Sequence, residues 1–265
     1  GQSNVTIEAG SEYIDLGATA IDEEDGDLSG SIQLVGEVKA NRPGSYELKY
    51  NVKDSSGNAA QTVTRTVAVV DTVPPVISLV GDSTITIEVG GSYVDKGATA
   101  QDVVDGDLSD QIKVSGEVVA NIVGNYQLTY AVTDAAGNAA STKIRTIAVI
   151  DTAPPVITLN GQSNVTIEAG SEYIDLGATA IDEEDGDLSG SIQLVGEVKA
   201  NKPGSYELKY NVKDSSGNEA QTVTRTVAVV DTVPPVISLV GDSTITIEVG
   251  GSYEDKGATA QDVVD

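Results

Sequence analysis

The chain has 265 residues, with 41 acidic and 15 basic side chains and a formal net charge of −26. This charge argues against nucleic acids and anionic membranes as partners, because both attract basic surfaces. Cysteine and histidine are absent, which excludes disulfides, soft-metal sites and the usual nucleophile–base pairs of enzymes. No run of 18 apolar residues occurs, so we expect no membrane insertion in this segment. We also expect no enzyme, because those catalytic pairs are missing.

The sequence repeats with a period of 80 residues. The match is much closer at twice that spacing, because residues 1–105 and 161–265 differ at only three positions. Two types of repeat therefore alternate along the chain. We call them A-type, at residues 1–70 and 151–230, and B-type, at residues 71–150 and 231–265.

The boundaries of the repeats are expected at three linkers with paired prolines, residues 71–75, 151–155 and 231–235. Paired prolines lack N–H donors and favour extended geometry, so each linker should be short and stiff. The sequence therefore predicts complete domains at residues 71–150 and 151–230. Residues 1–70 are expected to form a domain that lacks its first strand, and residues 231–265 the N-terminal part of a further domain.

Apolar residues alternate with a period of two along the B-type repeat, which indicates β-strands and no helix. The expected strands are, in chain order, residues 76–79, 84–88, 93–102, 112–114, 117–119, 125–132 and 142–150. A turn is expected at residues 134–138. About seven strands in 80 residues, separated by short turns, predict an all-β fold with antiparallel sandwiches.

The pattern Tyr-x-Leu-x-Tyr-x-Val-x-Asp from Tyr126 to Asp134 resembles the sixth strand of an immunoglobulin-like domain. Tyr126 takes the place of the tyrosine corner, and Leu128 stands where the second cysteine would be. Together with Gly-Ala-x-Ala-x-Asp, Asp-Gly-Asp-Leu and Asp-Thr-x-Pro-Pro, it resembles bacterial immunoglobulin-like tandem repeats of large surface and secreted adhesin-type proteins. The resemblance covers the whole chain. It implies a tandem array of ~80-residue immunoglobulin-like β-sandwiches, held together by apolar packing, at an extracellular or cell-surface location.

Each repeat carries an acidic loop, such as Asp102-Val103-Val104-Asp105-Gly106-Asp107, with three carboxylates in six residues. At ~6 Å spacing and an effective dielectric of about 20, each pair repels by roughly 3 kcal/mol. Water and salt can relieve this repulsion on an open surface, since Asp and Gly are common turn formers. Alternatively, a hard cation such as Ca²⁺ can bind among the oxygens, although the spacing is not that of an EF-hand. Both interpretations stay open.

The topology of an immunoglobulin-like sandwich tells where these carboxylates should meet. The loop after the second long strand and the loop after the sixth strand lie at the end where the chain enters. The residues expected to gather at that end of residues 71–150 are Asp71, Asp102, Asp105, Asp107 and Asp134. Glu8 and Asp15, from the preceding domain, should face them across the joint. Up to seven carboxylates would then surround one joint, and Ca²⁺ takes six to eight oxygens.

The same reasoning gives candidate calcium ligands in the other repeats. They are Asp22, Asp25, Asp27 and Asp54; Glu88, Asp95, Asp151, Asp182, Asp185, Asp187 and Asp214; and Glu168, Asp175, Asp231, Asp262 and Asp265. This arrangement resembles cadherin-like linkers, in which calcium stiffens successive domains into a rod.

We therefore expect a structural segment of an extracellular stalk or filament, stiffened by calcium at its joints and serving adhesion or surface extension. Its partners are expected to be neighbouring repeats of the same chain. One alternative is a subunit of a self-assembling filament joined by strand exchange. Another is a ligand-binding immunoglobulin-like module. A sugar site would need exposed aromatic rings, and the tyrosine positions left for that role are Tyr13, Tyr93, Tyr173 and Tyr253.

Overall fold

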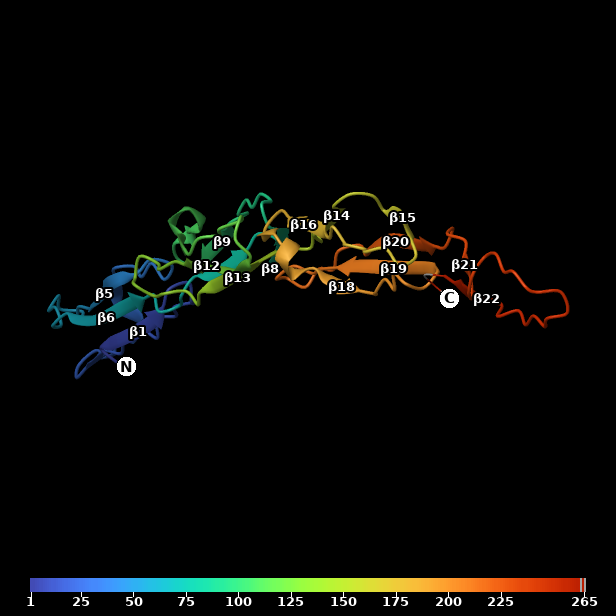
Figure 1. The fold of residues 1–265 in the computed structure, drawn as a ribbon. Coiled ribbons are helices and arrows are strands. Elements are labelled where there is room, and N and C mark those ends of the chain that lie inside the picture. Colours follow the sequence, from blue (N-terminus) through green and yellow to red (C-terminus); the bar gives the residue numbers. More distant parts are fainter. Residues whose placement is uncertain (263, 265) are drawn as a thin grey trace. The chain divides into compact units, whose positions relative to one another are not determined.

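A computed structural model of the chain describes residues 1–262 and residue 264 (Figure 1). The chain divides into two compact units, residues 1–150 and residues 151–265. Regular structure in the described residues is almost entirely β-strand, accompanied by three single-turn 3₁₀ helices: η1 Ser29–Ser31, η2 Ser109–Gln111 and η3 Ser189–Ser191. The predicted all-β fold is confirmed.

Residues 71–150 form a sandwich of two sheets, with strand orders β10-β9-β7 and β11-β12-β13-β8. Its strands are β7 Val76–Leu79, β8 Thr84–Glu88, β9 Ala98–Asp102, β10 Gly106–Asp107, β11 Lys113–Ser115, β12 Gly124–Ala131 and β13 Lys143–Ile150. The chain passes from the first sheet to the second between β7 and β8. As a result β8 runs parallel to β13, while the other pairings in this sandwich are antiparallel.

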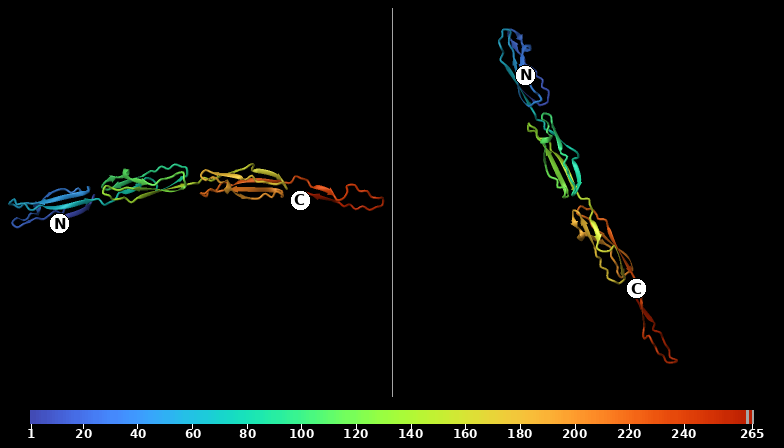
Figure 2. Two further views of the ribbon diagram at one scale, coloured as in Figure 1. Left: turned by 60° about the vertical axis from the view of Figure 1, so that its left-hand side comes forward. Right: turned by 90° about the horizontal axis from the view of Figure 1, so that it is seen from above.

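Residues 151–230 follow the same plan, and residues 1–70 and 231–262 contain parts of it (Figure 2). Residues 151–230 contain β14 Val156–Leu159, β15 Asn164–Glu168, β16 Ala178–Asp182, β17 Gly186–Asp187, β18 Gln193–Val195, β19 Gly204–Asn211 and β20 Val223–Val230. Residues 1–70 contain β1 Asn4–Glu8, β2 Ile21–Asp22, β3 Gly26–Asp27, β4 Gln33–Val35, β5 Gly44–Asn51 and β6 Val63–Val70. In residues 231–262, β21 Val236–Leu239 pairs with β22 Ala258–Gln261.

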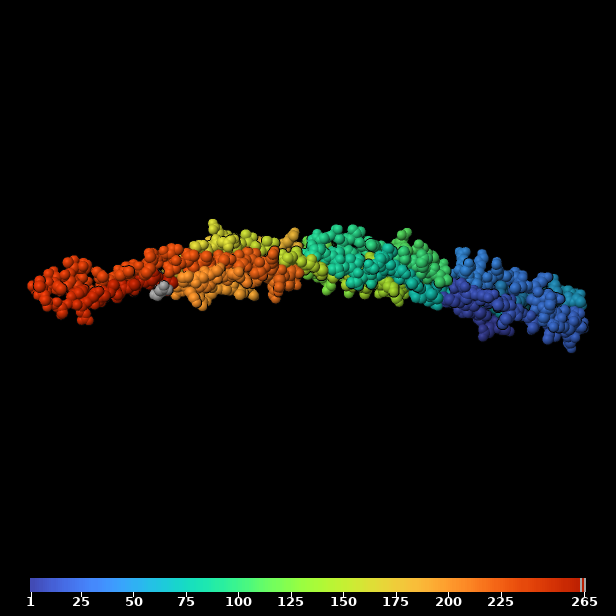
Figure 3. Space-filling view, turned by 90° about the vertical axis from the view of Figure 1, so that its right-hand side faces the viewer, coloured from blue at the N-terminus to red at the C-terminus, as the bar shows by residue number. Residues whose placement is uncertain are grey.

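The core of residues 71–150 lies between the two sheets. The alternation along β12 and into the residue that follows it places Leu128, Tyr130 and Val132 on the buried face, where they pack with Ile147 of β13. Tyr126 makes the expected corner, since its hydroxyl donates to the carbonyl of Ile122 at 2.9 Å. Apolar packing therefore holds the sheets together across the middle of the sandwich. Figure 3 shows the outer surface of the chain, beneath which this core lies.

Two predicted strands differ from the structure, and in both places a glycine accounts for the difference. The strand expected at residues 93–102 begins only at Ala98, because Gly97 has a φ of +74°, a left-handed conformation that interrupts a strand. The strand expected at residues 117–119 does not form. Gly116 has a φ of +103°, and a side chain there would meet the carbonyl oxygen of Gln127 at 2.1 Å. The chain leaves the sheet at this glycine.

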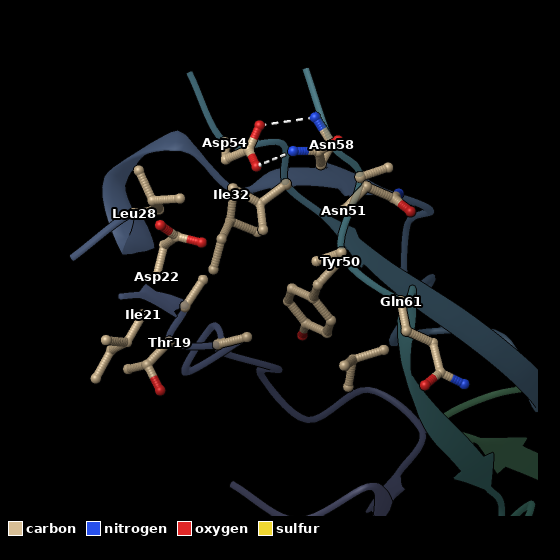
Figure 4. A pocket seen from close by; sticks show the side chains of 16 residues that line it. Thr19, Ile21, Asp22, Leu28, Ile32, Tyr50, Asn51, Asp54, Asn58 and Gln61 are labelled. Carbon is tan, nitrogen blue, oxygen red and sulfur yellow. Dashed lines mark hydrogen bonds between the residues drawn. The ribbon is translucent and has the colours of Figure 1, made fainter. Parts of the chain in front are cut away.

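A pocket lies between the sheets of residues 1–70 (Figure 4), lined by Ala20, Leu28, Ile32 and Tyr50 among others. In residues 71–150 the equivalents of Ala20 and Leu28 are buried together with Ile77 of β7. The pocket therefore corresponds to the place that a β7-like strand covers in the B-type sandwich.

Candidate metal centre

Three carboxylates meet at the linker end of residues 71–150, which is the end where the Pro-Pro linker joins the sandwich. Asp71, Asp105 and Asp134 each offer an oxygen, and these oxygens lie within 4.8 Å of one another. Asp71 belongs to the linker, Asp105 to the loop between β9 and β10, and Asp134 to the loop that follows β12. Asp71 and Asp134 are buried, at 9% and 7% exposure, whereas Asp105 is exposed. The sandwich topology brings together these three predicted residues, as expected.

Asn138 holds these segments in place. Its side-chain amide donates to the Asp134 carboxylate at 2.8 Å and to the backbone carbonyl of Asp71 at 3.1 Å. The Ala135 amide donates to Asp105 at 2.7 Å, which ties the two loops to each other. The turn at residues 134–138 therefore fixes the linker and both loops as well as reversing the chain.

Asp102 contributes a further carboxylate to this end. Its Oδ1 accepts the amides of Val104 at 2.8 Å and Asp105 at 2.9 Å, which shapes the acidic loop. Its Oδ2 is buried, and no hydrogen-bond donor among the described residues contacts it. Asp182, the equivalent in residues 151–230, also has a buried and unpartnered Oδ2, and its whole residue is only 4% exposed. A buried carboxylate oxygen without a donor is costly and calls for a partner such as water or an ion.

The pKa of Asp71 reflects the crowding of charge at this site. Burial raises it above its ordinary value, and the charges of Asp102, Asp134 and Glu8 raise it further, although the Val73 amide acts in the opposite direction. For Asp134, burial also acts to raise the pKa, but hydrogen bonds from Asn138 and from backbone amides outweigh it and lower the pKa. The site therefore combines a carboxylate that stays ionised with a neighbour whose charge is disfavoured unless a cation is present.

Glu8 lies at the joint between residues 1–70 and 71–150, as predicted. Its two carboxylate oxygens accept hydrogen bonds from the Thr72 amide at 2.7 Å and the Thr72 hydroxyl at 2.9 Å. Glu168 holds Thr232 in the same way, at 2.7 and 2.9 Å. Glutamate at the end of β1 or β15 thus fixes the first residues of the following linker.

Residues 151–230 carry three buried carboxylates at equivalent positions, Asp151, Asp182 and Asp214, at 7%, 4% and 6% exposure. Among the described residues, a group of three carboxylate oxygens within 4.8 Å of one another is found only at Asp71, Asp105 and Asp134. Asn218 joins the Asp214 carboxylate, at 2.8 Å, to the carbonyl of Asp151, at 3.1 Å. The Ser215 amide donates to Asp185 at 2.6 Å.

The remaining predicted ligands fall into several groups. In residues 1–70, Asp25 accepts a hydrogen bond from the Ser55 amide at 2.7 Å, and Asp54 accepts one from the Asn58 amide at 2.7 Å. Asp22, in the same acidic loop as Asp25, accepts the Glu24 amide at 2.9 Å. Glu88 ends β8. Asp231 is exposed, and Asp262 accepts the Val264 amide at 2.9 Å. Asp265 lies outside the described residues.

The placement of Asp15 at the joint is wrong, and so is that of its equivalents Asp95 and Asp175. Each makes an ion pair with an arginine of its own sandwich: Arg65, Arg145 and Arg225 respectively. Arg145 lies five residues before Ile150, which pairs with Glu88, so it is roughly 16 Å from that end of the strand at about 3.3 Å per residue. These aspartates therefore serve the interior of each sandwich.

Asp107 also has a different role from the one predicted, together with Asp27 and Asp187. Asp107 accepts the Ser109 amide at 2.9 Å and the Ser109 hydroxyl at 2.5 Å, at the start of η2. These two hydrogen bonds lower its pKa. Ser29 and Ser189 bind Asp27 and Asp187 equivalently. The third aspartate of each acidic loop thus stabilises a turn and is not one of the three clustered carboxylates.

Comparison with known proteins places the chain in a family. The model described as "Bacterial surface protein, Ig-like domain" matches residues 1–69, 77–149 and 157–229. The chain belongs to this family. Its members are surface proteins, which supports the expected surface location, and the predicted tandem array of immunoglobulin-like sandwiches is confirmed. Among the described residues, no helix is long and apolar enough to span a bilayer.

Individual relatives of this surface Ig-like chain are considerably longer than it is. Hyalin of Strongylocentrotus purpuratus is 35% identical over 249 residues, which cover 84% of this chain and 20% of hyalin. An uncharacterized 81.3 kDa protein of Acholeplasma phage L2 is 34% identical over 224 residues, covering 77% of this chain and 29% of that protein. A solved structure of CBM51-2 with GlcNAc and INT domains from Clostridium perfringens ZmpB is 28% identical, with a TM-score of 0.25, and covers 34% of this chain and 21% of that one.

The surface Ig-like sandwiches share a buried arginine that sequence reasoning missed. The Arg145 side chain is 0% exposed, and it pairs with Asp95 and donates to the Tyr130 hydroxyl at 3.1 Å. It also donates to three carbonyls near the passage between the sheets, those of Val80 at 2.6 Å, Asp82 at 3.1 Å and Gly97 at 3.2 Å. Its guanidinium therefore fastens the chain where it changes sheets. The signal was available, because Arg145 shares its strand face with the buried residues Ile147 and Val149.

Strong alkali should unfold these sandwiches through the tyrosines of this network. Burial and the hydrogen bond to Asp15 raise the pKa of Tyr50 to about 12 from 10.0, and Tyr130 is shifted in the same direction by burial and Asp95. Because the folded pKa lies above the unfolded one, the stabilisation is complete below pH ~10 and is lost as the pH rises through the folded value. Urea midpoints should fall steeply above about pH 10, and unchanged midpoints up to about pH 12 would contradict this role.

At low pH the dependence of stability on pH is reversed, so that stability rises with pH. Burial acts to raise the pKa of Asp95, but Tyr130, the Gly97 amide and Arg145 outweigh it and lower the pKa below 3.8. This contribution is present above the unfolded pKa and is lost as the pH falls through the folded one. Stability should therefore also decline below about pH 4.

Proposed function

We propose that this segment is a non-enzymatic spacer of a bacterial surface protein, in which calcium binds at the linker end of each sandwich and stiffens the joint. The role is that of a stalk that extends an adhesive or other functional part away from the cell. Neighbouring repeats of the same chain are its immediate partners.

The observation that carries this proposal is the buried, unpartnered carboxylate oxygen of Asp102 and of Asp182. At Asp102 it accompanies three further carboxylates whose oxygens cluster within 4.8 Å. Only oxygen ligands are present at this end, and an oxygen-only set suits a hard cation such as Ca²⁺. Bound calcium would offset the mutual repulsion that disfavours the charge of Asp71.

The location of the site supports a mechanical effect. Asp71 lies in the linker itself, and the next residue, Thr72, is held by Glu8 of the preceding sandwich. A cation shared by Asp71, Asp105 and Asp134 would tie the linker to two loops of the following sandwich. The orientation of the linker would then be fixed from both sides, which is how bound ions stiffen a chain of domains.

Removal of calcium from the full chain is expected to make it flexible and less stable. At a calcium concentration of 100 Kd, binding to the folded state alone stabilises by about 2.7 kcal/mol per site. Small-angle X-ray scattering should show a shorter maximum dimension in EDTA, and thermal unfolding should move to lower temperature. Magnesium at the same concentration serves as the control, because it prefers smaller octahedral sites that retain water. Superimposable scattering profiles and melting curves with and without calcium would refute the proposal in favour of solvated turns.

A further inference from the structure

The acidic loops of the two repeat types share one backbone framework but differ in two side chains. In the A-type loop Asp182 accepts the amides of Glu184 at 2.9 Å and Asp185 at 3.0 Å. In the B-type loop Asp102 accepts the equivalent amides at 2.8 and 2.9 Å. Between the two equivalent aspartates of each loop, the A-type loop carries Glu183 and Glu184, and the B-type loop carries Val103 and Val104.

The valines of the B-type loop have a contact of their own. Val103 approaches Gly10 of the preceding A-type sandwich so closely that a Cβ on Gly10 would lie 3.4 Å from its Cγ1. A methyl group against a glycine backbone requires no cation. Together with the hydrogen bonds from Thr72 to Glu8, it joins residues 1–70 to residues 71–150 directly.

The glutamates of the A-type loop are exposed and carry negative charge next to the buried carboxylates of residues 151–230. That site also contains an unpartnered oxygen, Oδ2 of Asp182, in a residue that is 4% exposed. Its equivalent in the B-type repeat, Asp102, acts electrostatically on the linker aspartate Asp71. The orphaned oxygen therefore belongs to the carboxylate group at the linker end.

We propose that the two repeat types bind calcium with different affinities. The A-type site of Asp151, Asp182, Asp185 and Asp214 binds more tightly, and the B-type site of Asp71, Asp102, Asp105 and Asp134 binds more weakly. This inference rests on the proposed calcium function. A glutamate about 8 Å from a divalent ion in water strengthens binding roughly fivefold at low salt and roughly twofold at 0.15 M salt.

Alternating affinity would make the array respond to calcium in two steps. At intermediate concentrations the A-type sites are occupied and the B-type sites are empty. The joint before each B-type sandwich then relies on Glu8, Thr72 and Val103, while the A-type linkers are already fixed by the ion.

Isothermal titration calorimetry of the full chain with calcium tests the difference in affinity between the two repeat types. A parent chain with Asp25→Asn, Asp54→Asn and Asp231→Asn removes candidate ligands from residues 1–70 and from the last repeat. It keeps the B-type site of residues 71–150 and the A-type site of residues 151–230. It should bind calcium in two classes, of which Asp185→Asn removes the tighter and Asp105→Asn the weaker. Circular dichroism of each variant checks that the sandwiches remain folded.

Reciprocal substitutions then isolate the loop charges. E183Q/E184Q should weaken the tighter class at least threefold, and V103E/V104E should strengthen the weaker class by a similar factor, with both effects shrinking at high salt. The control E197Q/E207Q removes the same charge from residues 151–230 outside the loop and should leave both affinities unchanged. Two sites of equal affinity, or swaps without effect, would overturn this inference but leave the proposed function standing. Absence of calcium binding in the parent and in the unmodified chain would overturn both.

Discussion

Replacement of Arg145 by methionine should unfold the sandwich of residues 71–150 in the otherwise intact chain. The change leaves Asp95 without its partner and removes the donor from the carbonyls of Val80, Asp82 and Gly97. Breaking a buried ion pair by removing one partner costs about 3–5 kcal/mol, and loss of the hydrogen bonds from the charged guanidinium to the carbonyls adds to this cost. A domain is typically stable by only about 5–15 kcal/mol.

Limited proteolysis followed by mass spectrometry would locate the effect. Cleavage should appear within residues 71–150, while residues 151–230 stay protected and serve as an internal reference. The matched control is Lys143→Met on the same strand, which is exposed and should change little. Arg145→Lys should fall between the two, since lysine keeps the charge but lacks the planar fork of donors. Equal resistance of R145M and the unmodified chain would show that the network is not needed for folding.

Asp182→Asn should leave the chain at least as stable in EDTA, but should make it less stable in calcium. Asparagine keeps an Oδ1 that can accept the amides of Glu184 and Asp185, and it removes the charge from the buried Oδ2. In EDTA the variant should be at least as stable as the unmodified chain, because an unpaired buried charge is gone. In saturating calcium it should lack the stabilisation of about 2.7 kcal/mol expected at 100 Kd.

Urea unfolding in the two conditions measures this crossover. Asp187→Asn, in the same loop, is the control: it weakens the turn at Ser189 and should destabilise equally with and without calcium. A D182N chain that is less stable in EDTA and still gains stability from calcium would assign Asp182 a purely structural role.

The fold could be predicted largely from local pattern. Alternation along residues 125–132 identified the buried face of β12, and glycines and prolines marked most turns. The parallel pairing of β8 with β13 could not be anticipated, since it joins residues about 62 apart in sequence and depends on where the chain changes sheets. The two-residue strand β10 was hidden in a loop whose composition indicates only a turn.

The sequence could predict which carboxylates of the candidate site lie together only where the strand order of the sandwich determines their positions. Placing Asp71, Asp105 and Asp134 together required only the order of strands in a sandwich. The role of Asp15 could not be predicted in the same way, because its partner Arg65 is 50 residues away in the sequence. Charge alone does not reveal whether an aspartate serves an ion or a buried arginine. For Asp107, the serine two residues later was the signal for a turn-stabilising role.

The most direct test of the central claim is an electron-density map of the full chain crystallised in saturating calcium. We expect a metal ion among Asp71, Asp105 and Asp134, with Oδ2 of Asp102 nearby and metal–oxygen distances of roughly 2.3–2.6 Å. An equivalent ion should lie beside Asp151 and Asp182. Water at ordinary hydrogen-bond distances of about 2.8 Å in both places would contradict it and leave the acidic loops as solvated turns.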